Sequence, residues 1–347
     1  MVPKRGLRVA VVGATGMVGR EVLDLLEARR FPVSALLPFS SGRKRQDVRF
    51  RGKTLAAPGV DAAALASCQL VFLVSSEDVA RRYGPSLAAR GVWVIDDSSE
   101  FRLDTKVPLV IPEVNPEALR FKSRLIAGPN CTVTGIAVAG HPLHRALGVR
   151  QARIASYQAV SGAGKEALNE FFAQNRRLAA GLRGGGRAPC PKAPAAAALP
   201  RSAALNVFPQ VGGFDAQGRC GEEVKVAAEL RKLWAAPSLE VSVTAVRVPV
   251  VRGHSLAAWL TLKRPASPAQ ARRLLARAPG LVLMREGDYP TPQTAAGRWP
   301  VYAGRLRRGV DGSELALWVV SDNLLKGAAL NSVQIAEELR RRRWLKL

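Results

Sequence analysis

Histidine and closely spaced cysteine are both scarce in this sequence of 347 residues. It has three histidines and four cysteines, and the cysteines form no C-x-x-C pair. The cysteines are Cys68, Cys131, Cys190 and Cys220. Their spacing matches no common metal site, so we predict no bound metal.

The sequence also lacks a long apolar run. No stretch reaches the length of about 18 residues that crosses a membrane, so we expect no membrane span. The opening MVPKRGLRVAVVGATG has basic residues and then apolar ones, but its short apolar run leads into a glycine turn and not a cleavage site. We therefore expect a protein of the reducing cytoplasm.

Acidic residues are few relative to basic ones. The 27 Asp and Glu stand against 52 Lys and Arg, which gives a formal net charge of +25. The basic residues are scattered, and the densest run, at 340–343, ends the last predicted helix, where the helix dipole favours cations. Because no nucleic-acid motif is present, we interpret this charge as a solvated surface and do not expect nucleic-acid binding.

The first part of the chain alternates strand and helix patterns. Residues 7–12 are apolar except for Arg8, as in a buried parallel strand, and the next apolar residues recur at helical spacing. Further strand patterns lie at 68–76, 92–99 and 124–131, with a helix pattern at 77–91. This alternation predicts an α/β fold whose N-terminal domain has a doubly wound, Rossmann-like parallel sheet.

The pattern changes near residue 149. Longer β-type segments at 149–162, 239–253 and 254–264 alternate as in a sheet covered on one face. Helix patterns that could cover it lie near 164–180, 221–234 and 268–278. The second domain is therefore predicted as α+β, with a mixed sheet covered by helices. The Gly-, Ala- and Pro-rich segment 181–205 is predicted to be an irregular loop, with ordering by a partner subunit as the alternative.

A glycine turn follows the first strand. The stretch GATGMVG has glycines at every third position between a strand and a helix, where backbone can approach a pyrophosphate at the helix N-terminus. Its context favours dinucleotide binding over a tight turn without a ligand. The residues concerned are Gly13, Ala14, Thr15, Gly16, Met17, Val18 and Gly19.

The end of the second strand indicates which dinucleotide is bound. An acidic residue there would accept the ribose hydroxyls of NAD, but this chain has Ser40 and Ser41, followed by Arg43 and Lys44. Hydroxyl groups and cations suit a 2′-phosphate, which favours NADP. The alternative is a basic surface loop.

Cys131 stands in LIAGPNCTVTG, where a strand ends and a helix begins. A helix N-terminus favours the reactive thiolate form of a cysteine, and the Asn130 amide could hold an oxyanion. The alternative is a buried structural thiol, which we expect for Cys68, Cys190 and Cys220.

One histidine and one arginine are candidates for the same chemistry. His141 and His144 lie in or near a helix that Pro142 is expected to break, where packing roles are favoured. His254 lies at a junction of two β segments and is the best candidate base. Arg247 could bind a substrate carboxylate, although it could equally be a surface strand residue.

Longer motifs give a resemblance over nearly the whole chain. The chain resembles the aspartate-semialdehyde dehydrogenases, because it contains a series of motifs in the order seen in that family. The motifs are GATGMVG, EFR, PEVN, GPNCT, YQAVSGAG, NVFPQVGGF, EEVK, VRVPVVRGH and WVVSDNLLKGAALNSVQIAE. The resemblance implies an NADP-binding domain at 1–131 plus 322–347, and a catalytic and dimerisation domain at 132–321. It also implies a homodimer or homotetramer.

The resemblance implies roles for individual residues. Cys131 matches the nucleophile, His254 the acid/base catalyst, and Gln158 the residue that orients the substrate. Arg102, Asn130 and Lys225 match phosphate-binding positions, while Glu222 and Arg247 match the positions that bind the substrate amino and α-carboxylate groups. Ser161, Gly162 and Asn323 match positions near the cofactor.

The implied activity is the NADPH-dependent reduction of aspartyl phosphate to aspartate semialdehyde through a thioester, in lysine, threonine and methionine biosynthesis. A reductase of N-acetylglutamyl phosphate is the enzyme alternative, and Glu222, suited to a free amine, argues against it. A noncatalytic paralogue that binds the cofactor or nucleic acid is the other alternative. The presence of Cys131, Gln158, Arg247 and His254 argues against loss of the chemistry.

Overall fold

The structure is a computed structural model that describes residues 6–181 and 195–347. The chain divides into two compact units. Unit 1 runs to Val138 and includes Ala228–Pro237 and Leu324–Leu347, while unit 2 comprises Ala139–Ala227 and Ser238–Asn323. The first boundary thus falls seven residues later than the Cys131 boundary predicted from the sequence, and unit 1 gains a segment from the middle of the chain.

Unit 1 is built on a parallel sheet with the strand order β2-β1-β5-β6-β7. Its strands are β1 (Leu7–Val12), β2 (Val33–Phe39), β3 (Asp47–Phe50), β4 (Lys53–Ala56), β5 (Leu70–Leu73), β6 (Trp93–Asp96) and β7 (Leu125–Ala127). Its helices include α1 (Met17–Ala28), α2 (Ala62–Ala66), α3 (Glu77–Ala89) and α9 (Leu330–Arg341). The order confirms the predicted Rossmann-like sheet, because the chain moves outward from β1 in both directions.

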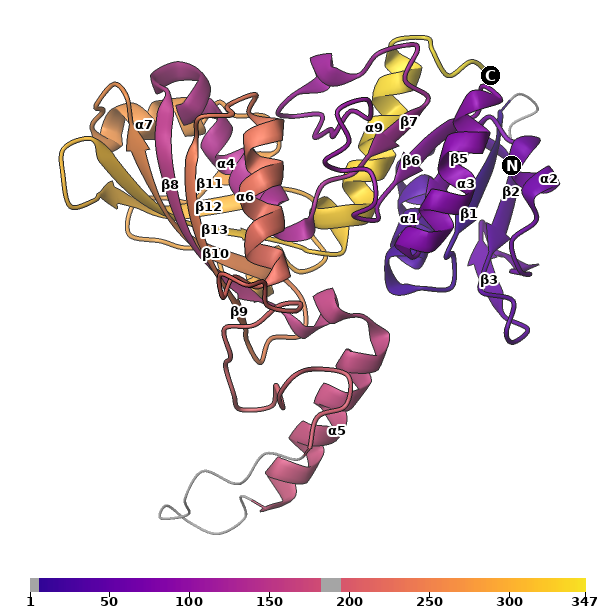
Figure 1. Ribbon diagram of the computed structural model, residues 1–347, viewed down its shortest axis with the longest axis horizontal. Helices are drawn as coiled ribbons and strands as arrows, with labels where there is room; N and C mark the ends of the chain where they lie inside the picture. The colour runs from indigo at the N-terminus through magenta and orange to yellow at the C-terminus, as the bar shows by residue number, and fades with distance from the viewer. Residues whose placement is uncertain (1–5, 182–194) are drawn as a thin grey trace. The chain divides into compact units, whose positions relative to one another are not determined.

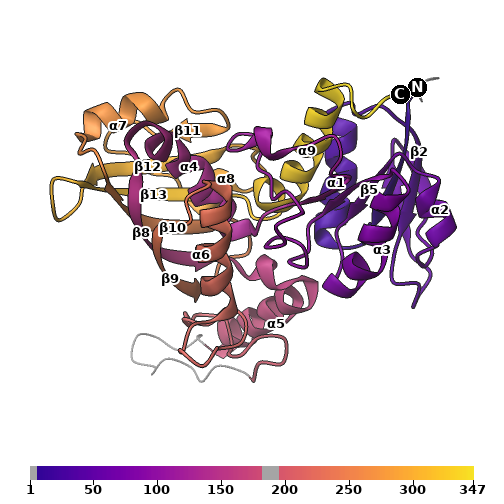
Figure 2. The same ribbon diagram turned by 45° about the horizontal axis from the view of Figure 1, so that its top comes forward.

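Helices cover both faces of this sheet. Figure 2 shows α1 and α9 on one side and α2 and α3 on the other, and α1 packs against α9 while α2 packs against α3. β1 and β5 are apolar and almost fully buried, as expected of central strands covered on both faces. The C-terminal helix α9 contributes Leu330, Val333 and Leu339 to the same core, so the chain's last segment completes the first unit.

Unit 2 is built on a mixed sheet with the strand order β11-β12-β13-β10-β8-β9 (Figure 1). Its strands are β8 (Val149–Gln158), β9 (Glu240–Arg247), β10 (His254–Leu262), β11 (Leu281–Leu283), β12 (Val301–Arg308) and β13 (Glu314–Ser321). Its helices include α5 (Lys165–Gly181), α7 (Pro268–Leu275) and α8 (Pro292–Ala295). β8 alternates between buried Ala152, Ile154 and Ser156 and exposed Arg153 and Tyr157, so one face of the sheet is buried, as predicted.

Two helices belong to both units. They are α4 (Cys131–Leu147) and α6 (Gly221–Leu233). The predicted break at Pro142 is wrong, because α4 continues through it. Proline removes one hydrogen bond from a helix, but α4 buries Val133, Ile136 and Leu143 completely. Burial of this helix outweighs the local cost of the proline.

The described part of the predicted loop at 181–205 is held by α5. Residues 195–205 form neither helix nor strand. The Gln174 side-chain oxygen accepts from the Ser202 hydroxyl at 2.9 Å and from Ala203 N at 3.2 Å, and Glu170 accepts from Ala197 N and Ala198 N. This chain's own helix therefore orders that stretch. Cys190 and the rest of the predicted loop lie outside the described residues.

Candidate active site

Cys131 is the first residue of α4, which confirms the predicted start of a helix at this position. Asn130 caps the helix, since its Oδ1 accepts from Thr132 N at 2.7 Å and Val133 N at 3.2 Å. The Cys131 side chain is half-buried. A half-buried thiol at a helix N-terminus lies where a thiolate is stabilised. Because the Asn130 oxygen caps the helix, the amide nitrogen is the atom that can donate to an anion.

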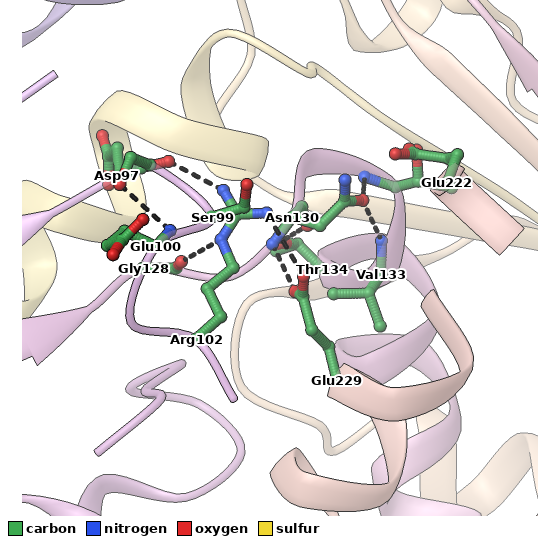
Figure 3. A network of polar contacts seen from close by, with 12 residues as sticks. Asp97, Ser99, Glu100, Arg102, Gly128, Asn130, Val133, Thr134, Glu222 and Glu229 are labelled. Carbon is green, nitrogen blue, oxygen red and sulfur yellow. Dashed lines mark hydrogen bonds and ion pairs between the residues drawn. The ribbon is translucent and has the colours of Figure 1, made fainter. Parts of the chain in front are cut away.

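Arg102 is buried in a network beside this helix start (Figure 3). Its Nε donates to Gly128 O at 2.9 Å and its Nη2 to Asp97 O at 2.7 Å. Its Nη1 forms an ion pair with Glu229 Oε1 at 3.2 Å. These contacts fix the plane of the guanidinium, which has five N–H donors in all.

Glu229 is the residue of this network that the sequence analysis missed. Its other carboxylate oxygen accepts from Asn130 N at 2.6 Å, so one side chain joins Arg102 to the residue before Cys131. The signal was present in the sequence: Glu222, Lys225 and Glu229 recur at i, i+3 and i+7, the spacing of one helix face. The matched motif ended at Lys225 and so left Glu229 out.

Unit 2 brings together two of the predicted substrate residues. Gln158 ends β8, and its Nε2 donates to Glu222 Oε1 at 3.0 Å and to Ser156 Oγ at 3.2 Å. Both Gln158 and Glu222 are buried. Lys225 lies one helical turn after Glu222 on α6 and is half-buried. A carboxylate and an amide held together in this way can bind an ammonium group.

Arg247 ends β9 and is buried, so it is not a surface strand residue. Its Nη1 donates to Ala159 O at 2.7 Å. The backbone of Arg247 also pairs with Phe208 on a neighbouring segment. A buried, oriented guanidinium suits a planar carboxylate better than a surface strand residue would.

His254 is the first residue of β10 and is completely buried. Its Nδ1 accepts from Ala159 N at 3.1 Å, which requires a lone pair on Nδ1 and places the proton of the neutral ring on Nε2. Burial lowers the pKa of the imidazole from 6.5 to about 3, with the charge of Arg247 as the second cause. At neutral pH His254 is therefore an uncharged ring that donates at Nε2.

This burial predicts a specific dependence of stability on pH. The unfolded chain protonates His254 near pH 6.5, whereas the folded protein does so only near its depressed pKa of about 3. Stability is therefore fully present above 6.5 and is lost on acidification through this window, by roughly 1.4 kcal/mol per pH unit. We expect His254→Gln to lack this contribution. Urea unfolding of both proteins across the window measures the difference, and equal slopes would contradict it.

Ser161 and Asn323 lie together, next to the segment that carries His254. The Asn323 Nδ2 donates to Ser161 Oγ at 3.0 Å, and the Asn323 Oδ1 accepts from Gly253 N at 2.9 Å. The predicted Gly162 also contacts the imidazole, since a methyl group at its Cα would lie 3.1 Å from His254 Nε2. These three residues thus form one cluster around the histidine.

The glycine turn fits a dinucleotide. The turn itself lies between β1 and α1, which begins at Met17, and the motif 13–19 continues into the first residues of that helix. A Cβ at Gly19 would lie 2.1 Å from Gly13 O, so only glycine allows the turn to fold this tightly onto the helix. The first N–H groups of α1, preceded by Gly16 without a side-chain cap, suit a pyrophosphate.

The loop after β2 holds the residues predicted for the 2′-phosphate. Ser40 is buried, and its hydroxyl donates to Ala57 O at 2.6 Å and accepts from Gly42 N at 3.2 Å. Ser41 and Arg43 are exposed. Ser40 therefore shapes the loop, while Ser41 and Arg43 can reach a ligand.

The other candidates belong to none of these clusters. His144, in α4, accepts from Val149 N at its Nδ1, and His141 lies in the same helix. Cys68 and Cys220 are buried. Across residues 6–181 and 195–347, no group of three or more His, Cys, Asp or Glu could hold a metal ion. No helix in that part of the chain is both long and apolar enough to span a membrane.

Two family models match the chain. Residues 8–121 match the semialdehyde dehydrogenase NAD-binding domain, and residues 141–326 match the semialdehyde dehydrogenase dimerisation domain. Among curated proteins, the aspartate-semialdehyde dehydrogenase of Shewanella violacea is 43% identical over 338 residues, which cover 95% of this chain and 97% of the relative.

Solved structures show the same similarity. The aspartate semialdehyde dehydrogenase II of Vibrio cholerae, complexed with ASA, has a TM-score of 0.90 at 36% identity, covering 97% of this chain and 99% of the other. The Candida albicans aspartate semialdehyde dehydrogenase, solved with NADP, has a TM-score of 0.73 at 21% identity, covering 98% of this chain and all of the other. The second likeness is one of fold.

Proposed function

This chain belongs to the aspartate-semialdehyde dehydrogenase family, and we propose that it reduces L-4-aspartyl phosphate to L-aspartate 4-semialdehyde with NADPH and releases phosphate. The observation that carries this proposal is Cys131, half-buried at the capped start of α4. A thiol placed there suits attack on an acyl phosphate. The product belongs to lysine, threonine and methionine biosynthesis, and a reducing cytoplasm suits a thiol nucleophile.

We assign substrate binding to buried charges of both signs. Arg247 binds the α-carboxylate, and Glu222, held by Gln158, binds the amino group. Arg102 and Lys225 bind the phosphate, with the Asn130 amide nitrogen as a further donor. A buried carboxylate at Glu222 favours a free amine over an acylated one, which favours aspartyl phosphate over N-acetylglutamyl phosphate.

The first chemical step forms a thioester. The Cys131 thiolate attacks the acyl carbon, the tetrahedral intermediate collapses, and phosphate leaves with its charge neutralised by Arg102 and Lys225. Gln158 orients the carbonyl. His254 donates from Nε2 to the oxygen that gains negative charge, and this hydrogen bond lowers the barrier in a site that excludes water.

NADP is the cofactor, and NADPH when bound supplies the hydride that reduces the thioester carbonyl. The glycine turn 13–19 would hold its pyrophosphate, Ser41 and Arg43 its 2′-phosphate, and Ser161, Gly162 and Asn323 would lie near the nicotinamide. His254 serves the second step in the same way, since the oxygen again becomes negative before Cys131 is released as a thiolate.

The function is tested by running the reaction in reverse. Purified protein is expected to reduce NADP when given aspartate semialdehyde and phosphate, and the rate is expected to vanish when phosphate is omitted. NAD in place of NADP tests cofactor preference, and N-acetylglutamate semialdehyde tests the other reductase. Turnover without phosphate, or faster turnover of the N-acetyl substrate, would overturn the assignment.

Assembly is the other part of the proposal. The matched dimerisation domain spans 141–326, and the partly exposed face of its sheet carries Tyr157 packed on Trp318, with ring centroids 5.4 Å apart. An aromatic pair in which Tyr157 is exposed and Trp318 half-buried suits a protein contact. We assign this face to a homodimer contact, as a dimer or within a tetramer, and assign no nucleic-acid partner. The mass in solution, measured by light scattering, tests the assembly.

A further inference from the structure

Glu229 places a negative charge inside the phosphate site. Its side chain is only 1% exposed, and it forms the ion pair with Arg102, a proposed phosphate ligand. Lys225, the second proposed phosphate ligand, lies one helical turn before Glu229 on α6. Substrate and product phosphate are anionic, so this carboxylate opposes their binding at the very cation with which it pairs.

The same helix also holds the backbone around Arg102. Lys232, three residues after Glu229, donates from Nζ to the carbonyl oxygens of Arg102, Asp104 and Val107 at 2.7 to 2.8 Å. The backbone of Arg102 is thus fixed without Glu229, and its guanidinium keeps its contacts to Gly128 O and Asp97 O. Orientation alone therefore does not account for a charged partner at this position.

We propose that Glu229 weakens phosphate binding at Arg102, and so lets phosphate leave once the thioester has formed. This inference rests on the proposed function and deepens it. The negative charge of Glu229 neutralises part of the positive charge of Arg102 and so weakens the attraction between Arg102 and phosphate. The same negative charge also repels the phosphate directly, across a short, partly desolvated distance. An effect of at least about tenfold in phosphate affinity is expected, because two unit charges about 4 Å apart change affinity roughly fivefold in water and far more at an effective dielectric constant of about 20.

The test is Glu229→Gln, which keeps the size and an oxygen to accept from Asn130 N but removes the charge. In NADP reduction, the KM for phosphate is expected to fall at least about tenfold, while the KM for aspartate semialdehyde and for NADP stay within about twofold. In the forward direction, product inhibition by phosphate is expected to strengthen by the same factor. An unchanged or higher KM for phosphate would overturn the inference.

Three variants separate this inference from its premises. Arg102→Gln is expected to raise the KM for phosphate, and Glu229→Gln is expected to add no further change in that background. Glu337→Gln breaks a different ion pair, with Arg29 at 2.7 Å, and serves as the matched control with an unchanged KM for phosphate. Glu229→Met is a second neutral variant of similar length, should Glu229→Gln fail to fold.

The outcomes are distinguishable. If the unmodified protein shows no phosphate dependence, the proposed function fails. If Arg102→Gln leaves the KM for phosphate unchanged, Arg102 is not a phosphate ligand. If Arg102→Gln raises it but neutral Glu229 variants do not lower it, the function stands and the role of Glu229 is refuted.

Discussion

Cys131→Ala is expected to lower kcat by about 10⁴-fold or more, because the variant lacks the thiol at the start of α4 that forms the covalent thioester. Alanine keeps the start of α4, since the Asn130 cap uses only backbone N–H groups of Thr132 and Val133. The variant should therefore fold and bind NADPH with unchanged affinity. Steady-state NADP reduction measures the loss, and nicotinamide fluorescence measures binding.

Cys68→Ala is the matched control. Cys68 is a buried cysteine of unit 1, and burial raises the pKa of its thiol, which keeps it protonated and unreactive. We expect this variant to keep its full rate, and iodoacetamide to modify Cys131 long before Cys68. Full activity in Cys131→Ala would refute covalent catalysis by Cys131. If Cys68→Ala lost activity and Cys131→Ala kept it, Cys131 would not be the nucleophile.

His254→Ala is expected to lower kcat by about 10²–10³-fold, the usual effect of removing one donor to an oxyanion. His254→Gln should restore part of the rate, because its amide can place a donor near the position of Nε2. KM for phosphate should change little in either variant. The kinetic pH profile of the unmodified protein should show no step near 6.5 from His254, because burial holds the pKa of this ring at about 3.

The same variants test whether His254 activates the thiol. A neutral imidazole adds no positive charge to stabilise a thiolate, so the pH dependence of Cys131 alkylation by iodoacetamide should match in the unmodified protein and in His254→Ala. A thiolate that forms at markedly lower pH in the unmodified protein would instead indicate a charged pair. That result would make His254 the base and contradict the assigned tautomer.

Local patterns in the sequence predicted the features that depend on local physics. Glycine spacing after an apolar strand predicted the turn motif at 13–19, and the end of a strand pattern in LIAGPNCTVTG predicted that a helix begins at Cys131. The alternation of strands and helices predicted the Rossmann-like sheet. Pro142 shows the limit of such patterns. Proline disfavours the interior of a helix, but the burial of α4 outweighs this local preference.

Contacts between segments distant in the sequence could not be predicted from local patterns. Glu229 joins Arg102 to Asn130 across sequence separations of 127 and 99 residues, and no local spacing records that pairing. The tautomer of His254 likewise depends on Ala159 N, 95 residues away. Arg247 also contacts distant residues, since its guanidinium donates to Ala159 O and its backbone pairs with Phe208.

The sequence by itself determined the fold class, the glycine turn after β1 and the helix start at Cys131, because the patterns that predict them lie within single strands, turns and helix starts. Only the tertiary structure decided the protonation state of His254, the burial of Arg247 and the presence of Glu229 beside Arg102. Burial and long-range hydrogen bonds set those properties, and both arise only when separate segments of the chain pack together.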